Sequence, residues 1–184
     1  LHFATLCAII FYYRSSLMVI SKDFFGSIVS RKLQGESMLA WAILLGTIPV
    51  GLAGLFFKDA IELNLRSYQV VAFATIFFGF LLGFSDWIHG VLGRSRDFIR
   101  GSDILIVGCF QALALIPGTS RSGITITAAL LIGLSRSLSI KFAFLLSIPV
   151  IALATLLKTF DLVNEVNQVD WTLLLIGFVI ALIT

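Results

Sequence analysis

Charged residues are scarce in this sequence: Asp, Glu, Lys and Arg make up 12% of its 184 residues, whereas hydrophobic residues make up 59%. A soluble domain has about 25% charged residues, because polar groups must cover its surface. Thirteen Lys and Arg against ten Asp and Glu leave a net charge of +3, with no basic stripe of the kind that binds nucleic acid. The composition therefore excludes an ordinary soluble globule and a disordered chain, and it predicts a polytopic membrane protein.

Side chains that hold metals or form disulfides are also few. The only histidines are His2 and His89, the only cysteines are Cys7 and Cys109, and apart from Asp86 near the end of Tyr68–Ile88 no carboxylate falls inside an apolar segment. We therefore expect no metal-binding residues in these 184 positions, and we expect both cysteines to be buried as small hydrophobic residues. The sequence has no G-x-x-x-x-G-K-[ST] loop, which excludes a nucleotide hydrolase of that type.

Most of the sequence consists of long apolar segments. A helix needs about 20 such residues to cross a bilayer. Met38–Phe57 and Tyr68–Ile88 are long enough, and Phe142–Leu157 is slightly short. Leu1–Tyr13 and Trp171–Ile183 are partial spans. We expect an all-α polytopic membrane protein, and we interpret the chain as a fragment truncated at both ends.

The segment 104–134 is apolar but is interrupted in its middle by Pro117, Gly118 and Gly123. Each half is too short to cross a membrane, so we predict a re-entrant helix pair that dips in and returns. This topology keeps Arg136 and Lys141 on the same side as the basic segments 14–37 and 87–102. Such a grouping fits the positive-inside rule and makes that side cytoplasmic.

A faint internal repeat suggests an inverted-repeat fold. Phe3-Ala4-x-Leu6 matches Phe142-Ala143-x-Leu145, and a rival register matches Ile48-Pro49-Val50 with Ile148-Pro149-Val150. On the first register we expect one membrane domain over 1–184. It would consist of a partial first repeat 1–88, a cytoplasmic loop 89–103 and a second repeat 104–184 with a re-entrant loop at 117–123.

The chemically informative run is Pro117–Thr125. Arg121 is the only charged residue between Ile104 and Ser135, and a charge at membrane depth indicates a functional site. The hydroxyls of Thr119, Ser120, Ser122 and Thr125 surround it, and Gly118 and Gly123 allow a tight turn that exposes backbone amides. A helix beginning near Ser122 or Gly123 would add its positive dipole end, so the run predicts an anion pocket suited to phosphate.

A plainer interpretation stays open for the same residues. The Ser and Thr side chains could bond back to helix carbonyls, and Arg121 could extend to the membrane interface. Gln111 could line the pocket or make an ordinary hydrogen bond between helices. Ser120 as a nucleophile would lack an activating base in this sequence.

The run Cys109–Thr125, CFQALALIPGTSRSGIT, resembles the second signature of the undecaprenyl-pyrophosphate phosphatases, the BacA or bacitracin-resistance family. Gly133-x-Ser135-Arg136 and Phe142-x-Phe144-Leu145-Leu146-x-Ile148-Pro149 fit the same family. The resemblance implies a multi-pass enzyme of the bacterial inner membrane. Such an enzyme hydrolyses undecaprenyl pyrophosphate to undecaprenyl phosphate and phosphate, recycling the lipid carrier of cell-wall synthesis, and requires a divalent metal, Mg or Ca.

Carried over residue by residue, the resemblance makes Arg121, Ser120 and Thr125 catalytic and makes Gly118, Thr119, Ser122, Gly123 and Gln111 substrate-binding. The glutamates and histidine of the family's first signature are not in this sequence, so we expect this piece alone to be inactive and to hold no metal. The alternative is a transporter or flippase for a phosphate-headed polyprenyl lipid. Expected partners are a polyprenyl pyrophosphate lipid, the bilayer and a second copy in a homodimer, and no nucleic acid.

Overall fold

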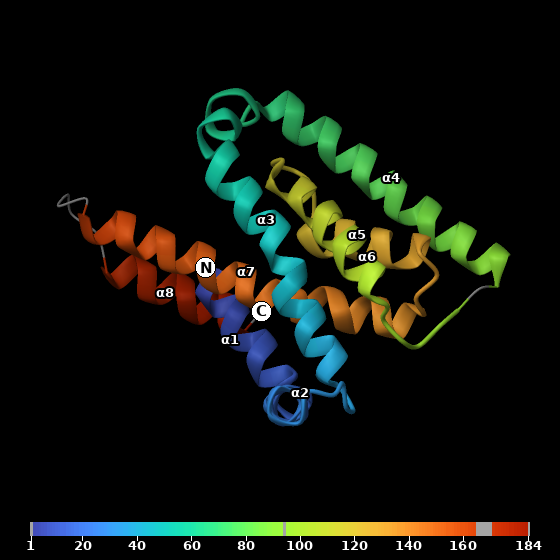
Figure 1. The fold of residues 1–184 in the computed structure, drawn as a ribbon. Helices are drawn as coiled ribbons and strands as arrows, with labels where there is room; N and C mark the ends of the chain where they lie inside the picture. The colour runs from blue at the N-terminus through green and yellow to red at the C-terminus, as the bar shows by residue number, and fades with distance from the viewer. Residues whose placement is uncertain (1, 94, 165–170, 184) are drawn as a thin grey trace.

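A computed structural model describes residues 2–93, 95–164 and 171–183, and these residues are almost entirely helical (Figure 1). Part of the acidic segment 158–170 lies outside the described residues. The elements in chain order are α1 (His2–Tyr12), α2 (Arg14–Ser30), α3 (Ser37–Asn64), α4 (Tyr68–Leu92), α5 (Gly101–Ala112), the 3₁₀ turn η1 (Leu113–Leu115), α6 (Arg121–Leu131), α7 (Arg136–Asn164) and α8 (Trp171–Ile183).

Three helices are long and apolar enough to cross a membrane: Ser37–Phe57 of α3, Tyr68–Leu92 of α4 and Arg136–Leu157 of α7. The bent pair α1 and α2 would make a fourth if it counted as one span. These are the segments that hydropathy predicted, with ends shifted by a few residues, because helices continue into the polar flanks that a hydropathy window excludes. The all-α membrane fold is confirmed.

The helices α5 and α6 form a hairpin that lies between α3 and α4 (Figure 1). α5 packs on α3, α6 packs on α4, and the two hairpin helices pack on each other. Among the described residues, α3 and α4 make no packing contact although they are consecutive. The hairpin therefore takes the place that a direct α3–α4 interface would occupy.

The helix α7 joins the rest of the molecule, because α1, α3 and α6 all pack against it. Phe142, Leu145 and Leu146 of α7 are fully buried in the core cluster. The repeat-like segment of α1 faces the same helix, with Ala4 and Leu6 buried. The helices that carry the two matched segments thus pack on each other, and the inverted relation of the repeats stays a prediction.

Close helix contact in the membrane region depends on glycine at one crossing. A Cβ on Gly108 of α5 would lie 2.8 Å from the carbonyl oxygen of Gly46 on α3 and 3.2 Å from Cγ of Pro49. A pair of small residues lets two helix backbones approach in this way. The Gly46–Gly108 crossing fixes α5, and with it the hairpin, against α3.

The polar ends of several elements meet at one end of the molecule. Lys141 Nζ of α7 donates to Glu36 Oε1 at 3.2 Å, and Arg136 Nε donates to Asp86 Oδ1 of α4 at 2.6 Å. The basic segments 14–37 and 87–102 and the start of α7 therefore share one side. This agrees with the grouping expected from the charges; that the side is cytoplasmic stays a prediction.

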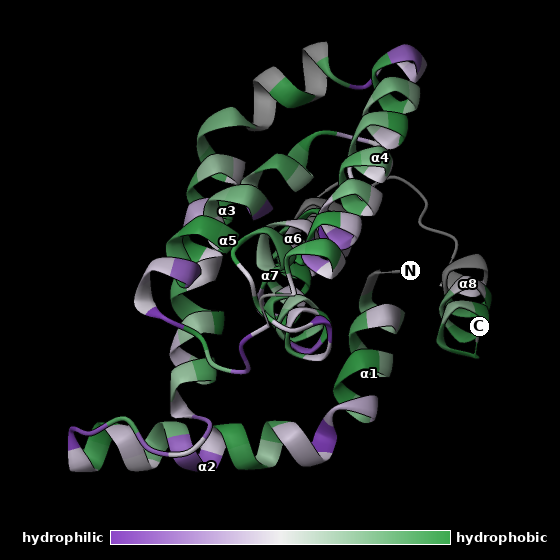
Figure 2. Cartoon of the chain, turned by 90° about the vertical axis from the view of Figure 1, so that its right-hand side faces the viewer, coloured by the Kyte–Doolittle hydropathy of each residue, from purple (hydrophilic) through white to green (hydrophobic). Residues whose placement is uncertain are grey.

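Two features differ from the sequence expectations. Segment 14–37 contains the seventeen-residue helix α2, bent by 80° from α1 and lying across the end of the bundle (Figure 2). Its mixed composition hid it, because a helix lying across the bundle end needs no continuous apolar run. The expected burial of the cysteines is wrong for both: Cys109 of α5 is exposed and Cys7 of α1 is only partly buried, because lipid-facing and core positions are equally apolar in a membrane protein.

Candidate active site

The base of the hairpin is closed by backbone pairing between its two ends. Arg96 N donates to the carbonyl oxygen of Gly133 at 3.1 Å, and Ser135 N donates to the carbonyl oxygen of Arg96 at 2.9 Å. The chain therefore enters α5 and leaves α6 at the same place. The twelve residues of α5 rise about 18 Å, roughly half of a bilayer's thickness, so with its base at a membrane surface the hairpin tip would lie at about mid-depth.

A buried ion pair fixes the same base. Arg96 Nη1 and Nη2 donate to the two carboxylate oxygens of Asp103 at 2.6 and 2.8 Å, and Nη2 also donates to the carbonyl oxygen of Ile132 at 3.0 Å. Burial alone would raise the pKa of the Asp103 carboxyl, but the bonds from Arg96 and from the Arg100 amide hold that pKa below its ordinary value. One guanidinium thus joins the start of α5 to the end of α6.

The tip of the hairpin is held against α4 through Gly118. Gly118 has φ +95°, a left-handed conformation that favours glycine. Its carbonyl oxygen accepts a hydrogen bond from Oγ1 of Thr75 at 3.1 Å, and a Cβ built there would lie 2.4 Å from the carbonyl oxygen of Val71. Only glycine fits both the turn and this close approach, so Gly118 sets where α6 begins.

Ser120 caps the N-terminus of α6. Its backbone is extended, and Oγ accepts a hydrogen bond from the Gly123 amide at 3.2 Å. The helix therefore begins at Arg121, slightly before the expected start near Ser122 or Gly123. By helix geometry the first amides have no partner inside the helix, and they point, with the positive end of the dipole, toward the hairpin tip. Ser120 is exposed.

Arg121 occupies the first turn of this helix and is half-buried. Within the described part of the chain, no hydrogen bond or ion pair involves its guanidinium, in contrast to Arg96 and Arg136. A cation at this depth without a carboxylate partner requires an anion or water to balance it. Its fork of N–H groups matches the paired oxygens of a phosphate.

The hydroxyl of Thr125 bonds within α6, whereas the hydroxyl of Ser122 lies beside the N-cap. Thr125 is buried, and its Oγ1 donates to the carbonyl oxygens of Arg121 and Ser122 at 2.9 and 3.0 Å. The back-bonded alternative therefore describes Thr125, whose hydroxyl stiffens the first turn of α6. The hydroxyl of Ser122 lies 3.4 Å from that of Ser120, on the open side of the cap.

Two polar side chains in the hairpin are buried without partners among the described residues. Both amide atoms of Gln111 and Oγ1 of Thr119 make no hydrogen bond, and the residues are 1% and 8% exposed. Leaving buried polar groups unpaired costs about 1–3 kcal/mol each. A ligand or water that reached them would remove this cost, which fits a substrate-binding role. The ordinary interhelical bond considered for Gln111 is not present.

The described residues do not fit a divalent metal on their own. No group of three His, Cys, Asp or Glu side chains within them could hold a metal ion. The tip offers only neutral oxygens, whereas Mg²⁺ and Ca²⁺ sites in proteins rely on carboxylates. The hairpin carries one carboxylate, Asp103, which Arg96 holds at its base. We therefore derive no step through a metal.

The tip of the hairpin brings together Ser120, Arg121 and the first amides of α6 on a Pro-Gly turn. The family model described as "Bacitracin resistance protein BacA" matches residues 1–184. The chain belongs to the BacA family. A BacA-family protein of Ruthia magnifica, named undecaprenyl-diphosphatase, is 52% identical over all of this chain and 69% of its own length. Undecaprenyl-diphosphatase 2 of Stutzerimonas stutzeri is 51% identical over all of this chain and 68% of its own length.

The structure shows two further residues that hold the hairpin in place and that the BacA-like signature did not indicate. Thr75 supports the Gly118 turn, and Arg96 closes the hairpin base. Thr75 is one of the few polar residues in the span Tyr68–Ile88, which was a usable signal. Arg96 looked like one more basic loop residue, and only the folded chain shows that it lies next to Asp103.

Proposed function

We propose that this BacA-family protein hydrolyses undecaprenyl pyrophosphate to undecaprenyl phosphate and inorganic phosphate, and that the α5–α6 hairpin tip binds the pyrophosphate. The observation that carries the proposal is Arg121, a half-buried guanidinium at the N-terminus of α6 that has no hydrogen-bond or ion-pair partner among the described residues. The names of the relatives support hydrolysis rather than transport as the reaction. Removal of the terminal phosphate from the lipid carrier is a membrane reaction, which fits a binding site at mid-depth.

In this mechanism Arg121 and the first amides of α6 hold the pyrophosphate and stabilise the charge that develops on its terminal phosphoryl group. Ser120 donates a hydrogen bond to a phosphate oxygen while its own oxygen caps the helix. Water adds to the terminal phosphorus, the bond to the bridging oxygen breaks, and undecaprenyl phosphate leaves. Ser122, Thr119 and Gln111 supply further polar contacts, Gly118 and Gly123 shape the turn, and Thr125 positions Arg121.

Three expectations from the resemblance remain proposals. The reaction would require a divalent cation, Mg²⁺ or Ca²⁺, whose ligands are not among the residues described. The protein works in the bacterial inner membrane. It pairs with a second copy as a homodimer, which cross-linking in membranes would measure.

The test is phosphate release from undecaprenyl or farnesyl pyrophosphate by the purified full-length protein in detergent, with and without added Mg²⁺ or Ca²⁺. We expect release by the wild type and its loss in Arg121→Ala. Arg136→Ala is the matched control, since it removes an arginine from the exposed ion pair with Asp86. Full activity in Arg121→Ala would remove the hairpin tip from the reaction. Substrate binding without release by well-folded wild type would favour the transporter.

A further inference from the structure

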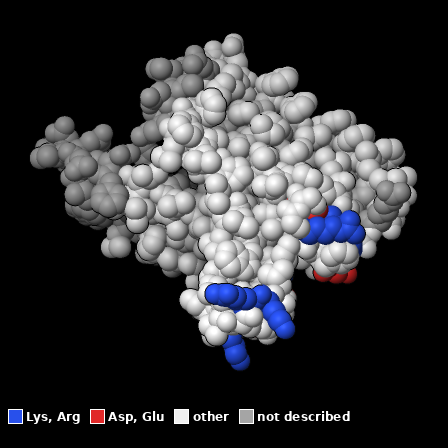
Figure 3. All heavy atoms as spheres, viewed as in Figure 1, with Lys and Arg blue, Asp and Glu red and all other residues white. Residues whose placement is uncertain are grey.

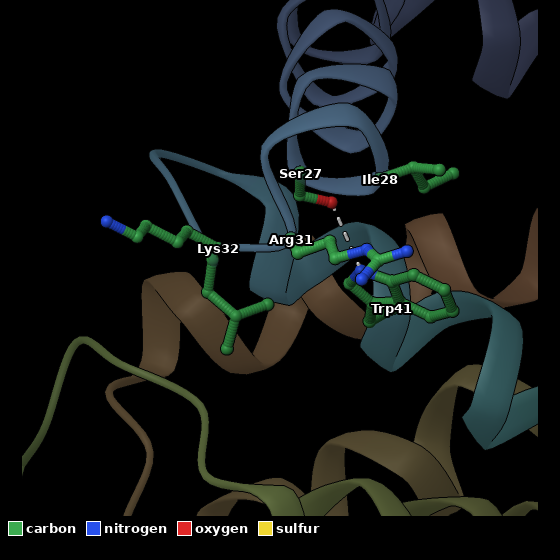
Figure 4. Close-up of a pocket in the computed structure, with 6 residues that line it drawn as sticks. Ser27, Ile28, Arg31, Lys32 and Trp41 are labelled. Carbon is green, nitrogen blue, oxygen red and sulfur yellow. Dashed lines mark hydrogen bonds between the residues drawn. The ribbon is translucent and has the colours of Figure 1, made fainter.

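A pocket lies at the far end of α2 from α1, away from the hairpin tip. Its six lining residues come from the end of α2, the turn after it and α3: Ser27, Ile28, Arg31, Lys32, Leu33 and Trp41 (Figure 4). Its volume is about 340 Å³, within the range of small-molecule sites. The lining combines two cations, Arg31 and Lys32, with apolar side chains.

The helix that carries this pocket has an apolar outer face. Met18, Phe25 and Val29 lie on one side of α2 and are 66%, 66% and 87% exposed. The opposite side, with Ile20 and Ser27, is buried against the bundle. A helix that lies across the bundle end and exposes an apolar face is placed to lie in the headgroup layer of a bilayer (Figure 2).

The wall of the pocket is fixed by hydrogen bonds and aromatic packing. Trp41 Nε1 donates to Ser27 Oγ at 3.3 Å, and the ring of Trp41 lies 5.0 Å from that of Phe24. Arg31 has φ 52°, the left-handed conformation that arginine rarely adopts. This conformation ends α2 and brings the Arg31 side chain over Trp41, while Lys32 extends the other way (Figure 4).

The charge of the pocket is not balanced by the protein. None of the six lining residues is acidic, and within the described ranges neither Arg31 nor Lys32 forms an ion pair. The nearby carboxylates are engaged elsewhere: Asp23 accepts from the Glu36 amide, and Glu36 accepts from Lys141. In Figure 3 the basic side chains at the lower end of the molecule stand without acidic ones, whereas those on the right lie beside acidic side chains.

We propose that this pocket binds the headgroup of an anionic phospholipid. The phosphate would bind Arg31, which would donate two parallel hydrogen bonds, and Lys32 would add positive charge at the edge of the pocket. The glycerol and upper acyl carbons would pack on Trp41, Ile28 and Leu33. A free phosphate ion would use only the cations, so the apolar half of the pocket favours a lipid. Basic residues beside a membrane attract anionic lipids electrostatically. The apolar walls of this pocket would in addition contact the lipid's glycerol and acyl carbons.

The test measures lipid retention by native mass spectrometry of the protein purified in detergent, with dioleoyl phosphatidylglycerol and dioleoyl phosphatidylcholine as probes. We expect phosphatidylglycerol to bind at least tenfold more tightly than phosphatidylcholine. The double variant Arg31→Gln/Lys32→Gln should lose this preference. The double variant Arg14→Gln/Lys22→Gln is the control, because it removes the same charge from α2 outside the pocket and should keep the preference.

Equal binding of the two lipids, or an equal loss of preference in both double variants, would overturn the proposal. Displacement of phosphatidylglycerol by millimolar inorganic phosphate would also overturn it. So would its displacement by farnesyl pyrophosphate at the concentration that occupies the hairpin. The last result would make the pocket a second site for the substrate. Phosphate release by Arg31→Gln/Lys32→Gln reports separately on the hydrolysis, so failure of one proposal is distinguishable from failure of the other.

Discussion

The guanidinium of Arg121 combines two properties, charge and a planar fork, and substitution can separate them. Arg121→Lys keeps the charge but loses the second parallel hydrogen bond to phosphate. A hydrogen bond to a charged group contributes about 1.5–3 kcal/mol, so we expect phosphate release to fall roughly 10- to 100-fold. Steady-state release from farnesyl pyrophosphate measures it. Arg100→Lys, in the exposed loop before α5, should leave the rate unchanged, and equal rates for wild type and Arg121→Lys would argue against a bidentate contact.

Gly118 offers a second substitution at the scale of one residue, with a matched control elsewhere in the chain. Gly118→Ala adds a methyl group 2.4 Å from the carbonyl oxygen of Val71 in a backbone with positive φ. Gly93→Ala places the same methyl group at φ +60° with nothing within 4 Å, so it tests conformational strain alone. Strain costs about 1–2 kcal/mol. We expect Gly118→Ala to lower thermal stability in detergent by clearly more than Gly93→Ala and to abolish phosphate release.

An equal stability loss in the two variants would mean that the tip moves away from α4 without cost. The bond from Thr75 to the Gly118 carbonyl would then be unimportant for the position of the tip. Thr75→Val, which removes only the hydroxyl, gives an independent measurement of that bond and should lower the rate less than Gly118→Ala.

At the scale of elements, the hairpin depends on how closely α5 approaches α3. Gly108→Ala would place a methyl group 2.8 Å from the carbonyl oxygen of Gly46, a backbone atom that cannot rotate away. Overpacking of this kind costs about 1–3 kcal/mol. Gly101→Ala, in the first turn of the same helix with nothing within 4 Å, should be neutral or slightly stabilising. Thermal unfolding monitored by light scattering compares them, and equal midpoints would contradict the tight crossing.

The ion pair at the hairpin base predicts a pH dependence of stability. The pKa of Asp103 is lowered in the folded protein, so its contribution is present above the unfolded pKa of about 3.9 and is lost as pH falls below it. We expect wild-type stability to decline on acidification below about pH 4. Asp103→Asn should be less stable at neutral pH, and the difference between the two proteins should shrink as the pH falls. A constant difference between pH 7 and pH 3 would exclude this contribution.

Across the whole molecule, the sequence predicted the features that depend on local residues and missed those that depend on distant neighbours. Hydropathy located α3, α4 and α7, because a span needs a continuous apolar run. Pro117 and Gly118 predicted the break in the hairpin, because these residues act on their own backbone. The helix α2 could not be found this way, since it needs only one apolar face. Thr75 and Arg96 were missed because their roles depend on neighbours more than thirty residues away in the chain.

The arrangement of charged ends supports a topology prediction for the complete fold. Contacts between Glu36 and Lys141 and between Asp86 and Arg136 place three basic segments at one end of the bundle. Single cysteines at Lys32, Arg100 and Ser137, in a background with Cys7 and Cys109 replaced by alanine, should all react with a membrane-impermeant maleimide from the cytoplasmic side. A cysteine at Arg66, between α3 and α4, should react only from the opposite side.

The position that decides the topology is Ser137, because it follows the hairpin. A re-entrant α5–α6 pair returns the chain to the side of Arg100, whereas a crossing segment would place Ser137 with Arg66. Labelling of Ser137→Cys from the side of Arg66 would therefore contradict the backbone pairing of Arg96 with Gly133 and Ser135 as the native arrangement. Labelling with Arg100 would instead place the Arg121 guanidinium within the thickness of the bilayer, at the tip of a hairpin whose base lies on the side of Arg100.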